Sequence, residues 1–323
     1  MQGWHSADES SSVTQDAPGP ERVTGVVLTH MRPRLAGEVT RSLLRDEGFA
    51  PERVIVVVNK DGGLDDPELE RSVRMIRLPH NSGPAGGFRA GLLEAFSDRE
   101  TKWAYLCEDD VSLFDLPSPR IDSLLGRVER HPEAQTIGAV VAYGRRFMPR
   151  TGHTVNVVPT RDGALDLERV DVACWGATLV SRSVFESGVL PDEEWYFGYE
   201  DFDFFCRVRE AGFAVLLDGE SARKVAPHQE SLAGRNRALE EHRPTDADEA
   251  WRAYYVARNF FALARRHGRT GWLLWHLAYS GRRIQLARAR PERMAILHGL
   301  WDGALGRLGE NSRYRRSVGE RSN

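Results

Sequence analysis

The first 110 residues alternate short apolar runs with segments of helical pattern, and this alternation limits the chain to few folds. The runs are nearly continuously apolar, which predicts strands buried on both faces. Between the first two runs, Leu35, Val39 and Leu43 recur at helical spacing before Gly48. This order implies an α/β fold with a mostly parallel, Rossmann-like sheet flanked by helices, whose ligands bind at the carboxyl ends of the strands. The four runs are residues 23–29, 53–59, 73–79 and 103–110.

Composition suits a soluble globular protein. The 323 residues are 41% hydrophobic and 28% charged, which is typical of one large domain with an appendage. Cys107, Cys174 and Cys206 show no CxxC spacing and predict reduced thiols in a cytoplasmic protein. No run reaches the roughly 18 apolar residues of a membrane span. The polar, Ser-rich residues 1–20 are expected to be disordered.

Charge is distributed unevenly along the chain. From Trp251 onward there are 15 arginines and four acidic residues, a balance of +11, so the first 250 residues carry −14 of the total of −3. We therefore expect residues 233–323 to form a basic helical module that meets phosphates, an anionic lipid surface or an acidic partner. A solvated helical face is the alternative. The polar stretch before this module predicts a domain boundary after residue 232.

An acidic triplet ends the fourth run. Glu108, Asp109 and Asp110 are like charges that repel one another, so a cation or hydrogen-bond donors are expected to meet them there. A second acidic pair, Glu200 and Asp201, begins a helical pattern that should stop near Gly212. Simple capping of that helix is the alternative reading of the pair.

Two weaker signals lie elsewhere. The loop at residues 80–91, "HNSGPAGGFRAG", follows a strand and opens a helix, so its glycines could let backbone N–H groups approach phosphate or sugar oxygens. Its glycines could equally start a closely packed helix. His228 follows a further short strand, and a single late histidine is more often structural than a metal ligand.

The order of these motifs is more specific than any one of them. A strand ending in Thr29 and followed by Arg32 precedes "VVVNKDGG", "NSGPAGG", the acidic triplet, "WGA", "GYEDFDFFCRVREAGF", His228 and "YYVARNFF". This order resembles the family 2 inverting glycosyltransferases of the GT-A fold, most of all their galactofuranosyl- and rhamnosyl-transferase branch. The resemblance implies a GT-A catalytic domain over residues 21–232 that takes a nucleoside-diphosphate sugar, UDP- or dTDP-linked, in cell-wall or glycoconjugate biosynthesis.

The resemblance also implies roles for individual residues. The triplet matches the family's DXD motif, which holds a divalent cation, Mn²⁺ or Mg²⁺, against the donor's diphosphate. Two departures, Glu108 in place of the usual Asp and Val58 before Asn59, put the metal affinity and the nucleotide in question. The implied metal ligands are Glu108, Asp110 and His228; the base is Asp201 with Glu200 beside it; the nucleotide-sugar contacts are Thr29, Arg32, Asn59, Asn81, Gly83, Gly86, Gly87 and Asp109; and the sugar-holding aromatics are Trp175, Trp195 and Tyr199.

The residues themselves are consistent with such chemistry. A cation at the triplet would neutralise the departing nucleoside diphosphate, while a carboxylate opposite it takes the proton of an acceptor hydroxyl, and inversion follows. For the acceptor we expect a hydroxyl compound, with a lipid-linked glycan and a small-molecule aglycone as the open alternatives, and no nucleic-acid partner is expected. A peripheral contact of the basic module with the inner face of the plasma membrane would suit the first.

Two other function classes remain open. A catalytically weak nucleotide-sugar-binding or scaffold protein would explain the departures at Glu108 and Val58. A sugar nucleotidyltransferase is the third possibility, but it needs a glycine-rich, basic loop directly after the first strand, and "VVLTHMRPRLAG" does not supply one.

Overall fold

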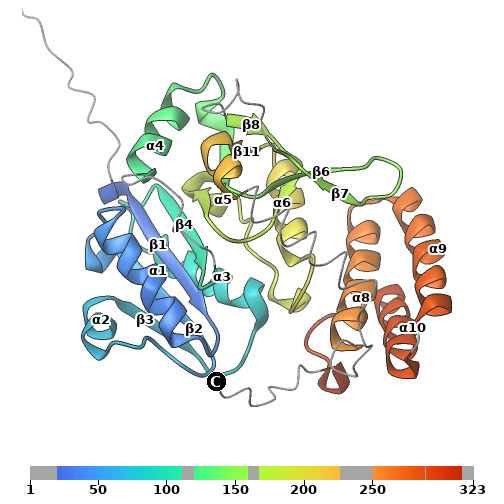
Figure 1. The fold of residues 1–323 in the computed structure, drawn as a ribbon. Coiled ribbons are helices and arrows are strands. Elements are labelled where there is room, and N and C mark those ends of the chain that lie inside the picture. Colours follow the sequence, from blue (N-terminus) through green and yellow to red (C-terminus); the bar gives the residue numbers. More distant parts are fainter. Residues whose placement is uncertain (1–19, 111–119, 159–166, 226–249, 288, 315–323) are drawn as a thin grey trace, which may run out of the picture.

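An eight-stranded mixed sheet forms the centre of the protein. The computed structural model describes residues 20–110, 120–158, 167–225, 250–287 and 289–314 (Figure 1). The expected disorder of residues 1–20 therefore falls almost wholly outside the described residues, and so does the boundary at 232. The sheet order is β3-β2-β1-β4-β10-β5-β11-β8. Its strands are β1 (Val23–Thr29), β2 (Val54–Asn59), β3 (Arg74–Leu78), β4 (Trp103–Glu108), β5 (Ile137–Val141), β8 (Leu167–Arg169), β10 (Thr178–Ser181) and β11 (Ala214–Asp218).

The predicted α/β class is confirmed, with two corrections. β1 and β2 consist of buried, largely β-branched residues, and β3, β2, β1 and β4 pair in parallel as expected. However, β10 runs antiparallel to both of its neighbours, and β8 runs antiparallel to β11. β3 is an edge strand with no buried residue, so its predicted burial on both faces is wrong.

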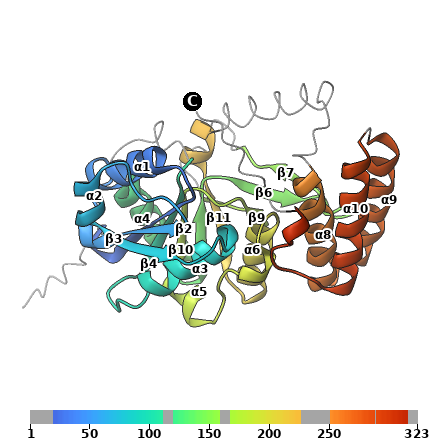
Figure 2. The same ribbon diagram turned by 90° about the horizontal axis from the view of Figure 1, so that it is seen from below.

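Helices cover both faces of this sheet (Figure 2). One apolar core joins the sheet to α1, α2 and α4, and the other joins it to α3, α5 and α6. A small sheet of β7, β6 and β9 lies between the main sheet and the C-terminal helices. These elements are α1 (Pro33–Arg45), α2 (Pro67–Ser72), α3 (Gly83–Ala95), α4 (Arg120–Arg130), α5 (Arg182–Glu186), α6 (Glu200–Glu210), β6 (Gly144–Phe147), β7 (Thr154–Asn156) and β9 (Val172–Ala173).

The C-terminal module is helical, as predicted, and comprises α8 (Ala250–Arg266), α9 (Thr270–Leu286) and α10 (Arg290–Leu305). The Thr-x-x-Asp spacing of Thr245 and Asp248 predicts the start of one helix that ends near Gly268, and residues 271–290 predict a second, whereas α10 has no such signal. This helix packs on α8 through its glycines: a Cβ at Gly299 would lie 2.4 Å from the carbonyl oxygen of Tyr254. None of the helices in the described ranges is long and apolar enough to cross a membrane.

The parallel strands set the position of the candidate site. Because β1, β2 and β4 run in the same direction, their carboxyl ends meet at one edge of the sheet. Thr29, Asn59 and Glu108 are the last residues of these strands. Residues predicted from three separate motifs are thereby brought to the same place.

Candidate active site

The acidic triplet meets a positive group, and that group is Arg32. Its guanidinium bridges two carboxylates, with Nη2 2.7 Å from Asp109 Oδ1 and Nη1 2.8 Å from Asp110 Oδ2. Asp109 is buried and also accepts a hydrogen bond of 2.7 Å from the Thr29 hydroxyl. Thr29 and Asp109 thus support the site from below, whereas Arg32 and Asp110 are about half exposed.

Asn59 joins three loops beneath the site. Its side-chain amide donates to Asn81 Oδ1 and to the carbonyl oxygen of Gly83, both at 3.0 Å, and its oxygen accepts from the Ser82 N–H. His30, which the sequence patterns did not single out, lies 2.6 Å from the Asn59 carbonyl oxygen through Nδ1. Asn59 is buried, so it positions the loop, whereas Asn81 is partly exposed at the site.

The glycines of the 80–91 loop serve close packing. Gly83, Gly86 and Gly87 are all buried, and the direct contact of their backbone with a donor stays a prediction. A Cβ at Gly87 would lie 2.3 Å from Leu28 Cδ1 of β1. Gly83 has a φ of +68°, and a Cβ there would lie 1.7 Å from the carbonyl oxygen of Tyr196, so only glycine fits.

The second acidic pair faces the triplet. Glu200 begins α6, as predicted, and Asp201 Oδ1 accepts from the N–H of Phe202 at 2.8 Å. Burial, Asp110, Asp201 and Asp109 raise the pKa of Glu108 to about 8. Burial also raises the pKa of Asp201 to about 7, against the opposing effect of the Phe202 N–H and Arg145. The two predicted acidic motifs therefore form one cluster of like charges.

Glu200 is a buried member of this cluster with one carboxyl oxygen left unpaired. Its side chain is 5% exposed, and Oε2 has no hydrogen-bond partner among the described residues. Burial and then Asp201 raise its pKa well above the usual range. The raised pKa favours the uncharged carboxyl, which can donate a hydrogen bond that a carboxylate cannot.

The three aromatic residues expected to hold sugars are placed differently from that expectation. Trp195 is fully buried and Trp175 is 3% exposed, the latter among Phe88, Phe204 and Phe205. Neither ring exposes a face on which a sugar could stack in this structure, and their role in holding sugars stays a prediction. Only Tyr199 is partly exposed, and its ring packs edge-on against Phe202 and Phe260.

Several residues around Asp201 carry no sequence signal. Arg145 of β6 lowers the pKa of Asp201, and its Nη1 lies 3.9 Å from the sulfur of Cys174. Cys174 in turn bonds to Asp201, while burial, followed by Asp201, raises the pKa of the thiol to about 12. Arg145 lies far from Asp201 in sequence, inside an otherwise ordinary strand, so no local pattern marks it as part of the site.

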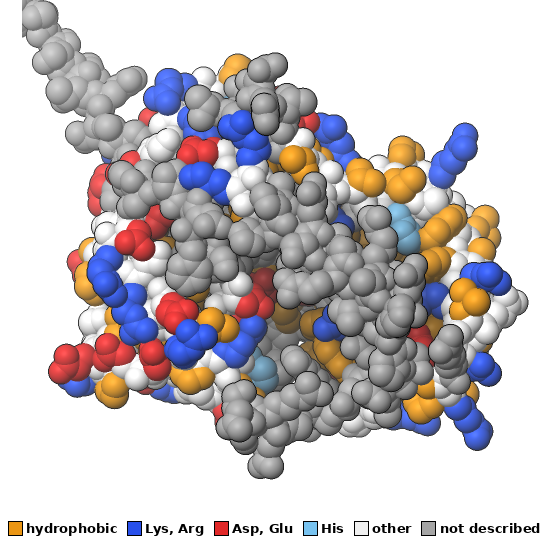
Figure 3. Space-filling view, in the orientation of Figure 1, with side chains coloured by type: hydrophobic (Ala, Val, Ile, Leu, Met, Phe, Trp, Pro, Cys, Tyr) orange, Lys and Arg blue, Asp and Glu red, His pale blue; other side chains and the backbone are white. Residues whose placement is uncertain are grey.

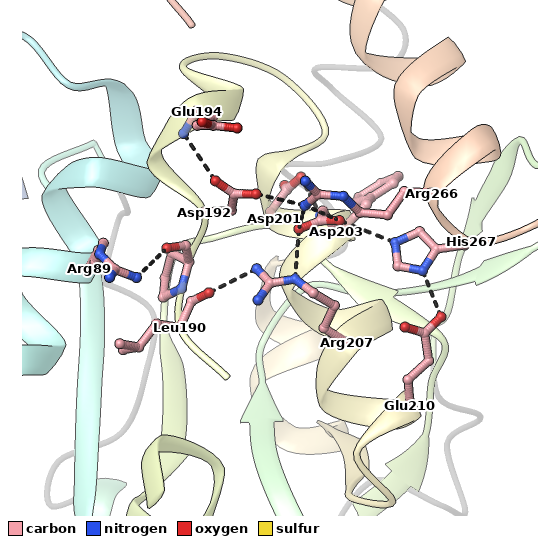
Figure 4. A network of polar contacts seen from close by, with 12 residues as sticks. Arg89, Leu190, Asp192, Glu194, Asp201, Asp203, Arg207, Glu210, Arg266 and His267 are labelled. Atoms are coloured by element: carbon pink, nitrogen blue, oxygen red, sulfur yellow. Dashed lines mark hydrogen bonds and ion pairs between the residues drawn. The ribbon is translucent and has the colours of Figure 1, made fainter. Parts of the chain in front are cut away.

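A second charged network lies on the same helix (Figure 4). Asp203 is fully buried and binds Arg207 Nε at 2.8 Å, Arg266 Nη1 at 3.1 Å and His267 Nε2 at 3.2 Å. His267 Nδ1 lies 2.6 Å from Glu210 Oε1. This network fastens α6 to the end of α8.

The chemistry of the carboxylates fits a divalent cation. Glu108 and Asp110 offer hard oxygen ligands, and Mg²⁺ typically binds through one or two carboxylates together with substrate phosphates and water. Within the described ranges no group of three or more His, Cys, Asp or Glu side chains is arranged to hold a metal ion. The third expected ligand, His228, lies outside the described residues.

Comparison with known proteins identifies no sequence relative. No known family's sequence profile matches the chain, and no curated protein matches it in sequence. Among solved structures, the mannosyltransferase PcManGT from Pyrobaculum calidifontis in complex with GDP-Man and Mn²⁺ is 15% identical, with a TM-score of 0.42 over 90% of this chain and 89% of that one. GalNAc-T7 with UDP, GalNAc and Mn²⁺ is 11% identical, with a TM-score of 0.43 over 60% of this chain. The match spans 41% of the length of GalNAc-T7. Likenesses at this identity concern the fold, which does not by itself imply function.

Proposed function

We propose that the protein is a glycosyltransferase of the GT-A type that moves a sugar from a nucleoside-diphosphate sugar to an acceptor hydroxyl with inversion. The observation that carries the proposal is the meeting of two acidic motifs, distant in sequence, at the carboxyl edge of the sheet. Asp201 lies close enough to Glu108 to raise its pKa. One motif is suited to a donor's diphosphate and its cation, and the other to an acceptor's proton.

Asp201 is the proposed base. A pKa of about 7 matches the operating pH at which a general base is most effective. The Asp201 carboxylate takes the proton from the acceptor hydroxyl while the hydroxyl oxygen attacks the anomeric carbon of the donor sugar. The bond between that carbon and the diphosphate oxygen breaks on the opposite side, in line with the attack. Glu200 beside it, whose pKa is raised by burial, is suited to donate a hydrogen bond to a sugar oxygen when its carboxyl is protonated.

The triplet is the proposed diphosphate site. A divalent cation, Mn²⁺ or Mg²⁺, would supply Lewis-acid stabilisation of the departing diphosphate when bound there. Glu108 and Asp110 are its proposed ligands, with His228 as the third. Arg32 and Asn81 are the exposed groups suited to contact the nucleotide, and Arg32 offers a fork of donors that matches phosphate oxygens.

A second candidate function rests on one observation. Arg32 already forms ion pairs with Asp109 and Asp110, so a cation has to compete with its guanidinium for Asp110. A protein that binds sugar nucleotides without transferring the sugar would tolerate this arrangement. The distinction is between binding alone and binding with turnover.

One experiment separates these functions. UDP, dTDP and GDP are screened by thermal shift with Mn²⁺ and with EDTA, and the matching nucleotide sugars are then tested for hydrolysis and for transfer. Metal-dependent stabilisation followed by release of the nucleoside diphosphate supports the transferase. Stabilisation without turnover across an acceptor panel supports the binding protein, and no response to any nucleotide contradicts both.

We further propose that α9 and α10 hold the enzyme at an anionic membrane surface, where a lipid-linked acceptor would be presented. Both helices expose large apolar side chains beside arginines, a mixture that favours an interfacial position. Figure 3 shows hydrophobic and Lys or Arg side chains interspersed on that side of the molecule. The apolar members are Leu274, Leu277, Leu286, Leu297, Trp301 and Leu305, each at least 45% exposed.

Vesicle binding tests this location. The full chain is sedimented with anionic and with neutral vesicles at low and high salt, against a variant with Arg282→Gln, Arg290→Gln and Trp301→Ala. The control carries Arg34→Gln and Arg71→Gln, which remove exposed arginines from α1 and α2. We expect salt-sensitive binding to anionic vesicles that only the first variant loses. Equal binding to both vesicle types, or none at low salt, contradicts the membrane location and favours a soluble acceptor.

A further inference from the structure

The segment that leads into α6 has a backbone that few residues adopt freely. Tyr196 has a φ of 61° and Tyr199 a φ of 66°, and neither is glycine. Such conformations are strained for residues other than glycine and persist only where the surroundings enforce them. Glu200 and Asp201 follow directly, so whatever enforces the segment also sets the position of both carboxyl groups.

The enforcing contacts come from α8. The side-chain amide of Asn259 donates to the carbonyl oxygens of Trp195, Phe197 and Gly198 at 3.1, 2.8 and 2.7 Å. Arg258 Nη2 donates to the same Trp195 oxygen at 3.0 Å. One side-chain amide thus binds three carbonyl oxygens of residues 195–198, just before Glu200 and Asp201.

Arg258 and Asn259 also fix each other. Arg258 Nε donates to Asn259 Oδ1 at 2.7 Å, which orients the amide so that its N–H groups face the segment. Both residues are 0% exposed. Among the described residues Arg258 makes no ion pair; its charge is met by carbonyl oxygens and by the ring faces of Tyr254 and Tyr255, at 5.4 and 4.8 Å.

Burying an arginine that has no carboxylate partner among the described residues is unfavourable, because the charge loses its hydration. Apolar packing would connect the two parts of the chain with a smaller free-energy penalty. Aromatic packing already joins α8 to this segment: the ring centroids of Phe197 and Trp251 lie 4.7 Å apart, and those of Tyr196 and Tyr255 lie 5.3 Å apart. The polar pair adds direction to this packing, since hydrogen bonds fix the orientation of three carbonyl groups.

We propose that Arg258 and Asn259 are positioning residues for Glu200 and Asp201, so that the C-terminal module completes the active site. The role of the carboxyl pair rests on the proposed function, but the control of the Trp195–Tyr199 backbone does not. In consequence, a chain cut before α8 should lack a competent site even where its sheet folds.

The test compares Asn259→Asp with Tyr254→Phe. The first keeps the shape of the side chain and replaces the donor with an oxygen that repels the three carbonyls. The second is the matched control: it removes the Tyr254 hydroxyl, which bonds to Asp302 and Asn311 and does not touch the segment. Asn259→Ala is the second variant, in case Asn259→Asp does not fold.

Two readouts are needed. Amide hydrogen exchange across residues 195–203 should accelerate at least tenfold in the Asn259 variants and remain unchanged there in Tyr254→Phe. Turnover of the donor found in the nucleotide screen should fall at least tenfold while the affinity for the nucleoside diphosphate with Mn²⁺ stays within about twofold, because the triplet and Arg32 are untouched.

Each outcome has a consequence. Unchanged exchange in the Asn259 variants overturns the proposal, and so does faster exchange with normal turnover. If Tyr254→Phe loses as much thermal stability and turnover as the Asn259 variants do, Arg258 and Asn259 contribute only ordinary packing. If the wild-type protein turns over no donor, the proposed function fails, whereas the exchange measurement still decides whether the pair holds the segment.

Discussion

Asp201 and Asp203 lie two residues apart on one helix, and their surroundings treat them in opposite ways. Asp203 is buried against Arg207, Arg266 and His267, and although burial alone would raise its pKa, these partners lower it. Asp201 is left with a backbone N–H, a thiol and a more distant arginine, and burial raises its pKa to about 7. The fold satisfies one carboxylate and leaves the other reactive, which is the pattern expected when one serves structure and the other serves chemistry.

The largest expected effect is on turnover. Asp201→Asn keeps the shape of the side chain and removes its basicity, so turnover should fall by roughly 10²–10⁴-fold while the affinity for the nucleoside diphosphate survives. The same change should raise stability at pH 8: the folded-state pKa of Asp201 lies above its unfolded value, so its ionisation costs stability as the pH rises toward 7 and beyond. Kinetics and thermal unfolding measure both. Near-normal turnover in Asp201→Asn would show that another group is the general base.

Asp203→Asn should instead lower the stability of the protein. Replacing a buried, fully paired carboxylate leaves Arg207 and Arg266 without their partner, which should cost about 3 kcal/mol of unfolding free energy, the lower end of the usual range because Arg266 is partly exposed. Chemical denaturation measures it. If Asp203→Asn is as stable as the wild type, the network in Figure 4 does not contribute to stability, and the contrast between Asp203 and Asp201 is weakened.

A smaller effect is expected at the triplet. Asp110→Asn should reduce the Mn²⁺-dependent part of nucleoside diphosphate affinity on the order of tenfold, because affinity for a hard cation follows the number of charged oxygen ligands. The fold should be unaffected because Asp110 is half exposed. Calorimetry with Mn²⁺ and with EDTA measures the difference, and Asp65→Asn, which also removes an exposed carboxylate paired with an arginine, is the control. Identical metal dependence in Asp110→Asn would remove it from the cation site.

The smallest effect is a pH dependence of stability. Burial lowers the pKa of His267, but Asp203 and Glu210 outweigh it, and the net pKa is raised. A raised folded-state pKa gives stability that is complete below the unfolded value of about 6.5 and is lost as the pH rises through the folded value. The melting temperature of the wild type should therefore exceed that of His267→Gln most clearly near pH 6, and less at pH 9. A difference independent of pH would mean that the imidazole is neutral in the network.

The sequence predicted the parts of this site that are local. Continuous apolar runs identified β1, β2 and β4, and Asp201 with Gly212 marked both ends of α6. Burial of Trp195 was not predicted, because it depends on which other elements cover the residue, whereas close packing of the loop glycines was one of the two alternatives that the sequence left open. The partners of Asp201 and the donors to the Trp195–Gly198 carbonyls come from β6 and α8, and such long-range pairings leave no spacing that a single sequence displays. Helix α10 was missed for a related reason: it meets α8 through Gly299 and Gly303, which give no apolar stripe.

The contact of Gly83 with the Tyr196 carbonyl has a consequence for how such a protein can diversify. The loop beside the predicted nucleotide site and the segment before Asp201 touch at a point that admits no side chain. A loop exchanged from another enzyme to alter donor preference must therefore bring its own glycine at this position, whatever else it changes. The loop beside the proposed donor site and the backbone before the proposed base are in this way sterically coupled at one point, so a change in one has to be compatible with the other.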